Sequence, residues 1–306
     1  RRAQGSLKPM SGFPDLGSVL TAMVTPMRDD FAVDLEGAAT LARQLIELGN
    51  DGLVVNGTTG ESPTTTDQEK SDLVRAVVAA VGDGVPVVAG VGTNDTSHSI
   101  ELAQAAERAG ATGLLVVTPY YSKPSQAGLL AHFCAVADST QLPVMLYDIP
   151  GRAGVPIAVE TLLRAAEHPR IVAVKDAKAD LGAATEVLRL TDLLWYSGDD
   201  ALNLPLLSLG ATGFVSVTGH LVADRLAAML RAYRAGDNEL ATSIFFSMAP
   251  VATGLFRAPA VSLTKAALSL QGRPAGPPRL PLLPADEDQL AVLVADLAEA
   301  DVRTSA

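Results

Sequence analysis

The chain has 306 residues, with 23 Lys and Arg against 34 Asp and Glu, which gives a formal net charge of −11. This acidic balance argues against an extended basic surface for nucleic acid or for anionic lipid. No uninterrupted apolar run reaches the roughly 18 residues that a membrane span needs, and the single cysteine, Cys134, excludes an internal disulfide framework. We therefore expect a soluble, cytoplasmic protein.

Residues 1–16 are interpreted as an N-terminal arm, because the opening stretch RRAQGSLKPMSG is polar and rich in turn-forming residues. From residue 19 onward, short apolar runs alternate with longer helical segments. The runs begin at residues 19, 52, 86, 113, 143, 171, 193 and 213. They consist mostly of Val, Leu and Ile and end in Gly, Pro, Thr or Asp, as expected for parallel strands that are covered on both faces.

The segments between these runs have helical spacing. In residues 34–50, Leu41, Leu45 and Leu48 fall on one face, and Gly49 can supply a C-terminal cap. The segment 96–110 repeats the pattern and ends at a glycine. Its predicted inward-facing residues are Ile100, Ala103, Ala106 and Ala109.

Eight strand–helix units within residues 17–235 predict an α/β fold, a (β/α)8 TIM barrel. The alternative is a doubly wound open sheet, which usually carries a phosphate-binding glycine fingerprint, and neither G-x-G-x-x-G nor a Walker A sequence occurs. Further helical segments after residue 235, one of them beyond the link GRPAGPPRLPLLP, exceed what a closed barrel needs. Residues 236–306 are therefore predicted to form a C-terminal helical extension, packed on the barrel or on a neighbouring subunit.

The stretch RIVAVKDAKAD, residues 170–180, places a lysine in what otherwise reads as the inside of a sheet. Because alternate residues of a barrel strand face the interior, Ile171, Ala173 and Lys175 are predicted to point inward and the two intervening valines outward. Lys175 then lies at the C-terminal end of the sixth strand, where barrel enzymes place their chemistry. Burial lowers the pKa of a lysine, and the neutral amine forms Schiff bases with ketones and aldehydes. The alternative is a lysine whose stem packs while its head reaches solvent or pairs with Asp176.

Three further motifs end at the same rim of the predicted barrel. GTTGES, residues 57–62, offers threonine hydroxyls and backbone N–H groups to a small anion. VTPYYSKP, residues 117–124, carries two adjacent tyrosines. LYDIPGRAG, residues 146–154, carries Tyr147, which can transfer protons, and Arg152, which can fork onto a carboxylate. Taken singly, these residues also fit an ordinary turn, a packed tyrosine and a surface cation.

Together, GTTGES, VTPYYSKP, YDIPGR, VKDAKAD and SGDDALNLP occur in the order and at the spacing of the pyruvate-dependent class I aldolase superfamily typified by dihydrodipicolinate synthase. The chain resembles that family over residues 17–300, most closely its actinobacterial members. The resemblance implies condensation of pyruvate with L-aspartate 4-semialdehyde to 4-hydroxy-tetrahydrodipicolinate, the first committed step of diaminopimelate and lysine biosynthesis. It also implies a homotetramer built as a dimer of dimers. Schiff-base chemistry needs no metal or organic cofactor, and the four histidines lack ligand spacing.

The resemblance assigns catalytic roles to four residues. Lys175 would form the Schiff base with pyruvate. Tyr147 would relay protons during imine formation and ring closure. It would be helped by Thr58 and by Tyr121, which in the family reaches across a dimer interface into the partner's site. These assignments require at least a dimer for activity.

Three further residues would bind the substrates. Thr59 would hold the pyruvate carboxylate together with Thr58, and Val215 would place a backbone carbonyl near the lysine. Arg152 would bind the carboxylate of the semialdehyde. Sister lyases such as N-acetylneuraminate lyase and the keto-deoxy sugar acid aldolases generally lack this arginine, so it favours a short acidic aldehyde. A barrel that binds pyruvate without catalysis is the alternative from another class.

The sequence departs from lysine-sensitive bacterial members of the family in one region. Those members carry histidines on the helix after the GTTGES loop and an acidic residue on the next helix, at the dimer interface. Here Asp67 and Lys70 stand at the histidine positions and His98 at the acidic one. We therefore predict weak or absent feedback inhibition by L-lysine.

Overall fold

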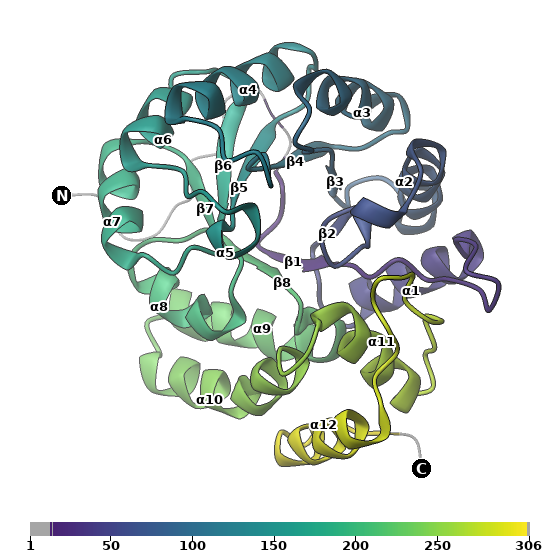
Figure 1. Ribbon diagram of the computed structural model, residues 1–306. Coiled ribbons are helices and arrows are strands. Elements are labelled where there is room, and N and C mark those ends of the chain that lie inside the picture. Colours follow the sequence, from purple (N-terminus) through teal and green to yellow (C-terminus); the bar gives the residue numbers. More distant parts are fainter. Residues whose placement is uncertain (1–12, 14, 305–306) are drawn as a thin grey trace.

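The computed structural model describes residue 13 and residues 15–304. Eight parallel strands pair in chain order, and β8 closes on β1 (Figure 1). This closed barrel confirms the predicted fold and rules out the open sheet. The strands are β1 Val19–Ala22, β2 Gly52–Val55, β3 Val87–Gly90, β4 Gly113–Val117, β5 Val144–Asp148, β6 Ile171–Asp176, β7 Leu194–Ser197 and β8 Gly213–Ser216.

Helices form a ring outside the barrel (Figure 1). They are α1 Leu35–Glu47, α2 Asp67–Val81, α3 Thr96–Arg108, α4 Gln126–Asp138, α6 Val159–Ala165, α7 Leu181–Leu190, α8 Asn203–Ser208 and α9 Gly219–Arg234. Three short helical turns follow the C-terminal ends of strands, at the face of the barrel where the predicted site lies. They are η1 Ser62–Thr64, α5 Pro150–Ala153 and η2 Asp200–Leu202.

The predicted apolar faces are largely as expected. In α1, Leu41 and Leu45 are buried, whereas Leu48 is half-buried because it lies one residue past the helix, at its C-cap. Gly49 follows with φ +119°, a value that suits glycine. The inner face of α3 differs slightly from the prediction, because Ile100 sits at its edge and is only half-buried. The buried residues there are Ser99, Leu102, Ala103, Ala106 and Ala109.

Strand β6 breaks the regular alternation that the sequence suggested. Val144 pairs with Ile171, but the next residue of β5, Met145, pairs with Ala173, so Val172 is an extra residue in β6. Ala173 therefore faces the barrel interior, as predicted, while Ile171 packs in the layer between strands and helices. The expectations that Ile171 points inward and Val172 outward were wrong, because a bulge shifts the pattern by one residue and Val172 packs against the interior cluster.

The C-terminal extension contains α10 Asn238–Leu255, α11 Ala260–Leu270 and α12 Glu287–Glu299. Helix α10 packs on α9, and α12 packs on α10, outside the ring of barrel helices (Figure 1). Within the described residues, no single helix is long and apolar enough to cross a membrane, although α10 and α11 pass that test as a pair bent by 114°. The division of the chain at residues 16 and 235 stays a prediction, and residues 1–12 and 14 of the expected arm lie outside the described part.

Candidate active site

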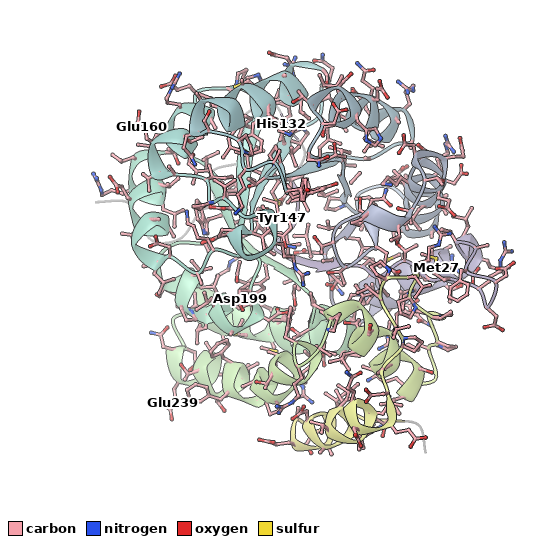
Figure 2. The ribbon with its side chains drawn as sticks, in the orientation of Figure 1. Met27, His132, Tyr147, Glu160, Asp199 and Glu239 are labelled. Carbon is pink, nitrogen blue, oxygen red and sulfur yellow. The ribbon has the colours of Figure 1, made fainter. Side chains whose placement is uncertain are left out.

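Lys175 points into the barrel from the C-terminal half of β6 and is 5% exposed. Its Nζ lies 4.3 Å from the centroid of the Tyr147 ring, on the neighbouring strand β5. Gly198, just after β7, makes room for the lysine stem, since a Cβ there would lie 2.9 Å from Lys175 Cε. Figure 2 shows Tyr147 near the middle of the barrel. Lysine and tyrosine thus meet inside the barrel; the sequence predicted the inward-pointing lysine and placed the tyrosine at the end of its strand.

Burial lowers the pKa of Lys175 to about 8, because the protein interior solvates the ammonium form poorly. The negative charge of Asp200 opposes this shift, and the positive charge of Arg152 adds to it. The neutral fraction of the amine near physiological pH is therefore much larger than in an exposed lysine, and the neutral amine is the form that attacks carbonyl carbon.

Asp200 is held by four hydrogen bonds in the turn η2. One carboxylate oxygen accepts from Ser216 Oγ at 2.5 Å and from Asn203 Nδ2 at 3.0 Å. The other accepts from the backbone N–H groups of Val217 and Thr218, each at 2.9 Å. The carboxylate is 6% exposed at the residue level, so its charge acts on Lys175 through a water-poor interior.

Tyr147 is 5% exposed. Burial raises the pKa of its hydroxyl to about 12, while the charge of Arg152 and a hydrogen bond with Thr58 act in the opposite direction. The phenol is consequently protonated at neutral pH and has a hydroxyl partner beside it. This arrangement suits a group that donates and recovers a proton.

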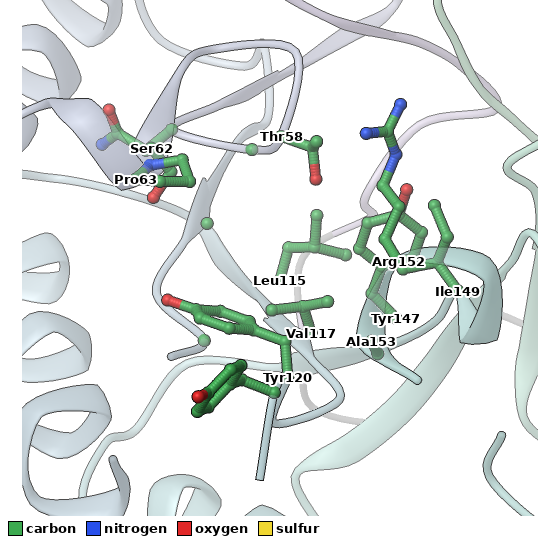
Figure 3. A pocket seen from close by; sticks show the side chains of 15 residues that line it. Thr58, Ser62, Pro63, Leu115, Val117, Tyr120, Tyr147, Ile149, Arg152 and Ala153 are labelled. Atoms are coloured by element: carbon green, nitrogen blue, oxygen red, sulfur yellow. The ribbon is translucent and has the colours of Figure 1, made fainter. Parts of the chain in front are cut away.

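A cavity of about 360 Å³ is lined in part by Tyr147, Thr58 and Arg152. Figure 3 shows Thr58, Tyr147 and Arg152 together at its edge, with Tyr120 across from them. Tyr121 also lines it and is 91% exposed. The other lining residues are Asn56, Gly57, Ser62, Pro63, Gly90, Gly92, Leu115, Val117, Ile149 and Ala153.

Three predicted residues lie beside this cavity and do not form its wall. Lys175 is not in its wall, but its Nζ lies 4.3 Å from the ring centroid of Tyr147, which is. Thr59 is buried in the loop next to Thr58. Val215 packs inside the barrel with the interior cluster that contains Tyr147. The structure thus gathers all seven predicted site residues at one end of the barrel.

The turn that carries Arg152, residues 148–157, is held at its C-terminal end by a buried ion pair. Asp148 Oδ1 accepts a hydrogen bond from the backbone N–H of Ile157 at 3.1 Å. Lys178 Nζ lies 3.0 Å from Asp148 Oδ2 and donates to the carbonyl of Ile157 at 3.1 Å. Asp148 is 1% exposed, so this ion pair is well shielded from water. The backbone N–H and the carbonyl of Ile157 are therefore both bound by the buried pair of Asp148 and Lys178.

The charges that depart from the lysine-sensitive pattern form their own contacts. His98 Nε2 lies 2.9 Å from Asp67 Oδ2, which joins α3 to α2. Lys70 is buried, and its Nζ donates to the carbonyl of Thr65. Burial lowers the pKa of Lys70, against the charges of Asp67 and Glu69.

Sequence reasoning did not identify Asp200 or Gly198 as parts of the site. Both belong to the motif SGDDALNLP, which was used only for its resemblance. A signal was present, because an acidic residue three positions after a barrel strand lies at the same rim as the lysine. Residues 13 and 15–304 contain no group of three or more His, Cys, Asp or Glu placed to hold a metal ion.

Comparisons with known proteins identify the family of the chain. A family model described as the dihydrodipicolinate synthetase family matches residues 15–300. A protein of Streptomyces coelicolor named 4-hydroxy-tetrahydrodipicolinate synthase 2 is 62% identical, over 94% of this chain and 96% of its own length. The synthase of Acidothermus cellulolyticus is also 62% identical, over 93% of this chain and 92% of its own.

Solved structures give the same answer. The dihydrodipicolinate synthase of Bacillus anthracis superposes with a TM-score of 0.91 at 43% identity, covering 94% of this chain and 99% of that one. The enzyme of Cyanidioschyzon merolae, solved with lysine bound, gives a TM-score of 0.92 at 41% identity, with 94% and 99% covered. This chain, folded as a closed eight-stranded barrel, belongs to the dihydrodipicolinate synthetase family.

Proposed function

We propose that the chain condenses pyruvate with L-aspartate 4-semialdehyde to give 4-hydroxy-tetrahydrodipicolinate, a step of diaminopimelate and lysine biosynthesis. One observation carries this proposal: Lys175, with its pKa lowered to about 8, has its Nζ 4.3 Å from the ring centroid of Tyr147, a residue that lines an open cavity. A buried amine of this kind is the nucleophile that Schiff-base catalysis needs.

The reaction follows from the groups in place. The neutral amine of Lys175 attacks the keto carbon of pyruvate, and loss of water gives an iminium, with Tyr147 and Thr58 carrying the protons. The iminium withdraws electrons, so the pyruvate methyl group loses a proton and becomes an enamine. Its terminal carbon attacks the aldehyde carbon. The amine of the bound adduct then displaces Lys175 by transimination, which closes the ring and restores the enzyme.

The carboxylates of the two substrates need separate partners. Thr58 and Thr59 offer hydroxyl and backbone donors to pyruvate, and Val215 offers its carbonyl near the lysine. Arg152, at the edge of the cavity, suits the carboxylate of the semialdehyde, since a guanidinium forks onto a carboxylate. A sugar-acid lyase, the main rival within the superfamily, would instead need partners for a chain of hydroxyl groups.

We also propose a homo-oligomer, a dimer of dimers, in the cytoplasm. Tyr121 supports this proposal because it is 91% exposed and held at φ +69°, a conformation that is strained for a bulky side chain. A strained turn that presents an aromatic ring to solvent beside a cavity fits a residue that completes a partner's site. The substrates are small metabolites of amino-acid synthesis, which fits a cytoplasmic location.

Borohydride trapping and steady-state kinetics test the reaction. Reduction in the presence of pyruvate should leave an irreversible adduct on Lys175, and Lys175→Ala should abolish both adduct and turnover. The wild type should use aspartate semialdehyde and ignore N-acetylmannosamine, and Arg152→Ala should lose the semialdehyde reaction. Turnover of the sugar would instead indicate a sialic-acid-type lyase, and absence of an adduct would indicate a barrel without this catalysis.

A further inference from the structure

The loop proposed to bind pyruvate has a fixed and unusual backbone. Glu61 N donates to the carbonyl of Thr58 at 3.1 Å, and Ser62 N donates to that of Gly57 at 3.3 Å. Glu61 has φ +58°, in the left-handed region that few residues other than glycine adopt. Such a conformation persists only where the surrounding structure enforces it. Residues 57–62, GTTGES, are called the threonine loop. The backbone conformation of this loop thus depends on the contacts that hold Glu61.

The side chain of Glu61 is held from the C-terminal extension. Lys265 of α11 places its Nζ 2.6 Å from Glu61 Oε1, and both residues are 3% exposed. The same Nζ donates to the carbonyl of Pro277 at 3.0 Å, which ties the pair to the segment after α11. Burial lowers the pKa of Lys265, and its contact with Glu61 works against that shift. Breaking a buried pair of this kind leaves one charge uncompensated.

Arg279 binds the second oxygen and the adjoining turn. Its backbone N–H donates to Glu61 Oε2 at 2.7 Å, and its guanidinium donates to the carbonyl of Thr64 at 2.7 Å. The guanidinium also binds the carboxylate of Glu69, at the start of α2, and the carbonyl of Phe31. Figure 1 shows the chain after α11 running beside the segment that follows β1. The extension therefore contacts the chain on both sides of η1, at Glu61 before it and at Glu69 after it.

We propose that Glu61, Lys265 and Arg279 are positioning residues for pyruvate, and that they make the C-terminal extension part of the pyruvate site. They do not touch the cavity, whose wall contains none of them. They act through the loop, by fixing the turn that closes from Thr58 to Glu61. The inference rests on the proposed function, because it takes Thr58 and its loop as the pyruvate-binding element.

The experiment compares the Michaelis constants of the two substrates in Lys265→Met and Glu61→Gln. A loosened threonine loop should raise KM for pyruvate about tenfold while KM for the semialdehyde changes less than about twofold. Lys265→Met leaves a buried carboxylate without its cation, so the double variant Glu61→Gln with Lys265→Met, which removes both charges, should show the same split. Lys265→Arg, which keeps the charge, should restore part of the pyruvate affinity.

Arg257→Met provides the matched control. Arg257 forms an ion pair with Asp296 at 2.7 Å, within the same extension and away from the threonine loop. It should lower thermal stability without moving KM for pyruvate. Wild-type KM for pyruvate in the folded single and double variants would overturn the inference. An equal rise of KM for pyruvate in Arg257→Met would also overturn it.

Borohydride trapping separates this inference from the proposed function. If the wild type forms a pyruvate adduct at Lys175 and the variants form it at unchanged pyruvate concentrations, only the positioning role fails. If the wild type forms no adduct, the proposed function fails, and the positioning role falls with it. The expected result is an adduct in every variant, half-saturated at about tenfold higher pyruvate in those that break the pair.

Discussion

At the residue scale, the state of Lys175 results from opposed electrostatic effects. Burial inside the barrel favours the neutral amine, and the carboxylate of Asp200 favours the charged one. The balance places the pKa at about 8, far enough below that of a free lysine to supply neutral amine and close enough to retain a proton donor. Geometry and charge here serve the same chemical need.

The pH dependence of kcat/KM for pyruvate should report this group. Because only the neutral amine attacks, the rate should rise with pH and level off above an apparent pKa of about 8. Initial rates between pH 6 and 10 in constant ionic strength would measure it. A limb near the ordinary lysine value of about 10.4 would show that burial does not act as described.

Removing the charge of Asp200 should move the pH at which kcat/KM for pyruvate rises. In Asp200→Asn the negative charge that raises the pKa of Lys175 is gone, so the limb should shift to lower pH. Asp199→Asn is the matched control, because Asp199 caps η2 by accepting a hydrogen bond from Ala201 N, whereas the charges that shift the pKa of Lys175 are those of Asp200 and Arg152. Thermal unfolding should accompany the profiles, since Asp200 also binds two backbone N–H groups. A limb that stays in place, or moves upward, contradicts the assigned effect.

Single residues were predictable from sequence where a pattern or a motif marked them. Lys175 was found because a lysine interrupts an apolar strand, and Tyr147, Thr58 and Arg152 because they end other strands of the same barrel. Asp200 was missed, since its effect depends on a turn that folds back toward the lysine. The role of Glu61 was equally invisible, because its partners lie in the extension, far along the chain.

At the element scale, short loops aim the reactive groups and buried ion pairs hold the loops. The turn from Asp148 to Ile157 carries Arg152 and is closed by Lys178. The short apolar runs predicted the strands, and the helical spacing of the segments between them predicted the helices. It could not predict the extra residue in β6, because a bulge leaves the composition of a strand unchanged.

Lys178→Met should therefore weaken binding of the semialdehyde specifically. Loss of the ammonium leaves Asp148 buried without its cation, which should cost about 3 kcal/mol of stability, and the freed turn should displace Arg152. We expect KM for the semialdehyde to rise severalfold with KM for pyruvate nearly unchanged. Steady-state kinetics and urea unfolding would measure the two effects. Lys123→Met, an exposed cation beside Gly154 of the same turn, controls for the lost charge.

The contacts between α2 and α3 bear on feedback inhibition. Asp67 is engaged by His98, and Lys70 adds a cation where the lysine-sensitive pattern has histidine. A cationic ligand such as L-lysine would meet an altered set of charges there. Titration of initial rates with L-lysine should show weak or no inhibition at physiological concentrations, and strong inhibition in that range would refute the prediction.

At the scale of the whole molecule, one chain buries Lys175 almost entirely but leaves Tyr121 in solvent. The count of strand–helix units predicted the closed barrel, because eight consecutive strands that are each followed by a helix are what a (β/α)8 barrel contains. Oligomeric state was not predictable from residue patterns in the same way, since the groups that meet across an interface belong to two chains.

Tyr121→Phe tests the oligomer. If the hydroxyl serves a partner's site, the variant should lose activity about a hundredfold while its borohydride adduct with pyruvate still forms. Sedimentation of the wild type should show at least a dimer. Tyr120→Phe is the neighbouring control, because Tyr120 lines the same cavity but is half-buried, whereas Tyr121 stands in solvent where a partner can meet it. A fully active monomer would contradict the proposed role of Tyr121.

The bulge in β6 also bears on how the enzyme can change length during evolution. With Val172 as a spare residue, loss of one residue between Ile171 and Lys175 would restore regular alternation and leave the lysine on the interior side. Strand β5 has no such spare residue, so loss of Leu146 would turn Tyr147 toward the helices. Lys175 and Tyr147 thus differ in their tolerance of deletions: β6 can lose one residue and keep Lys175 facing inward, whereas β5 cannot lose one and keep Tyr147 facing inward.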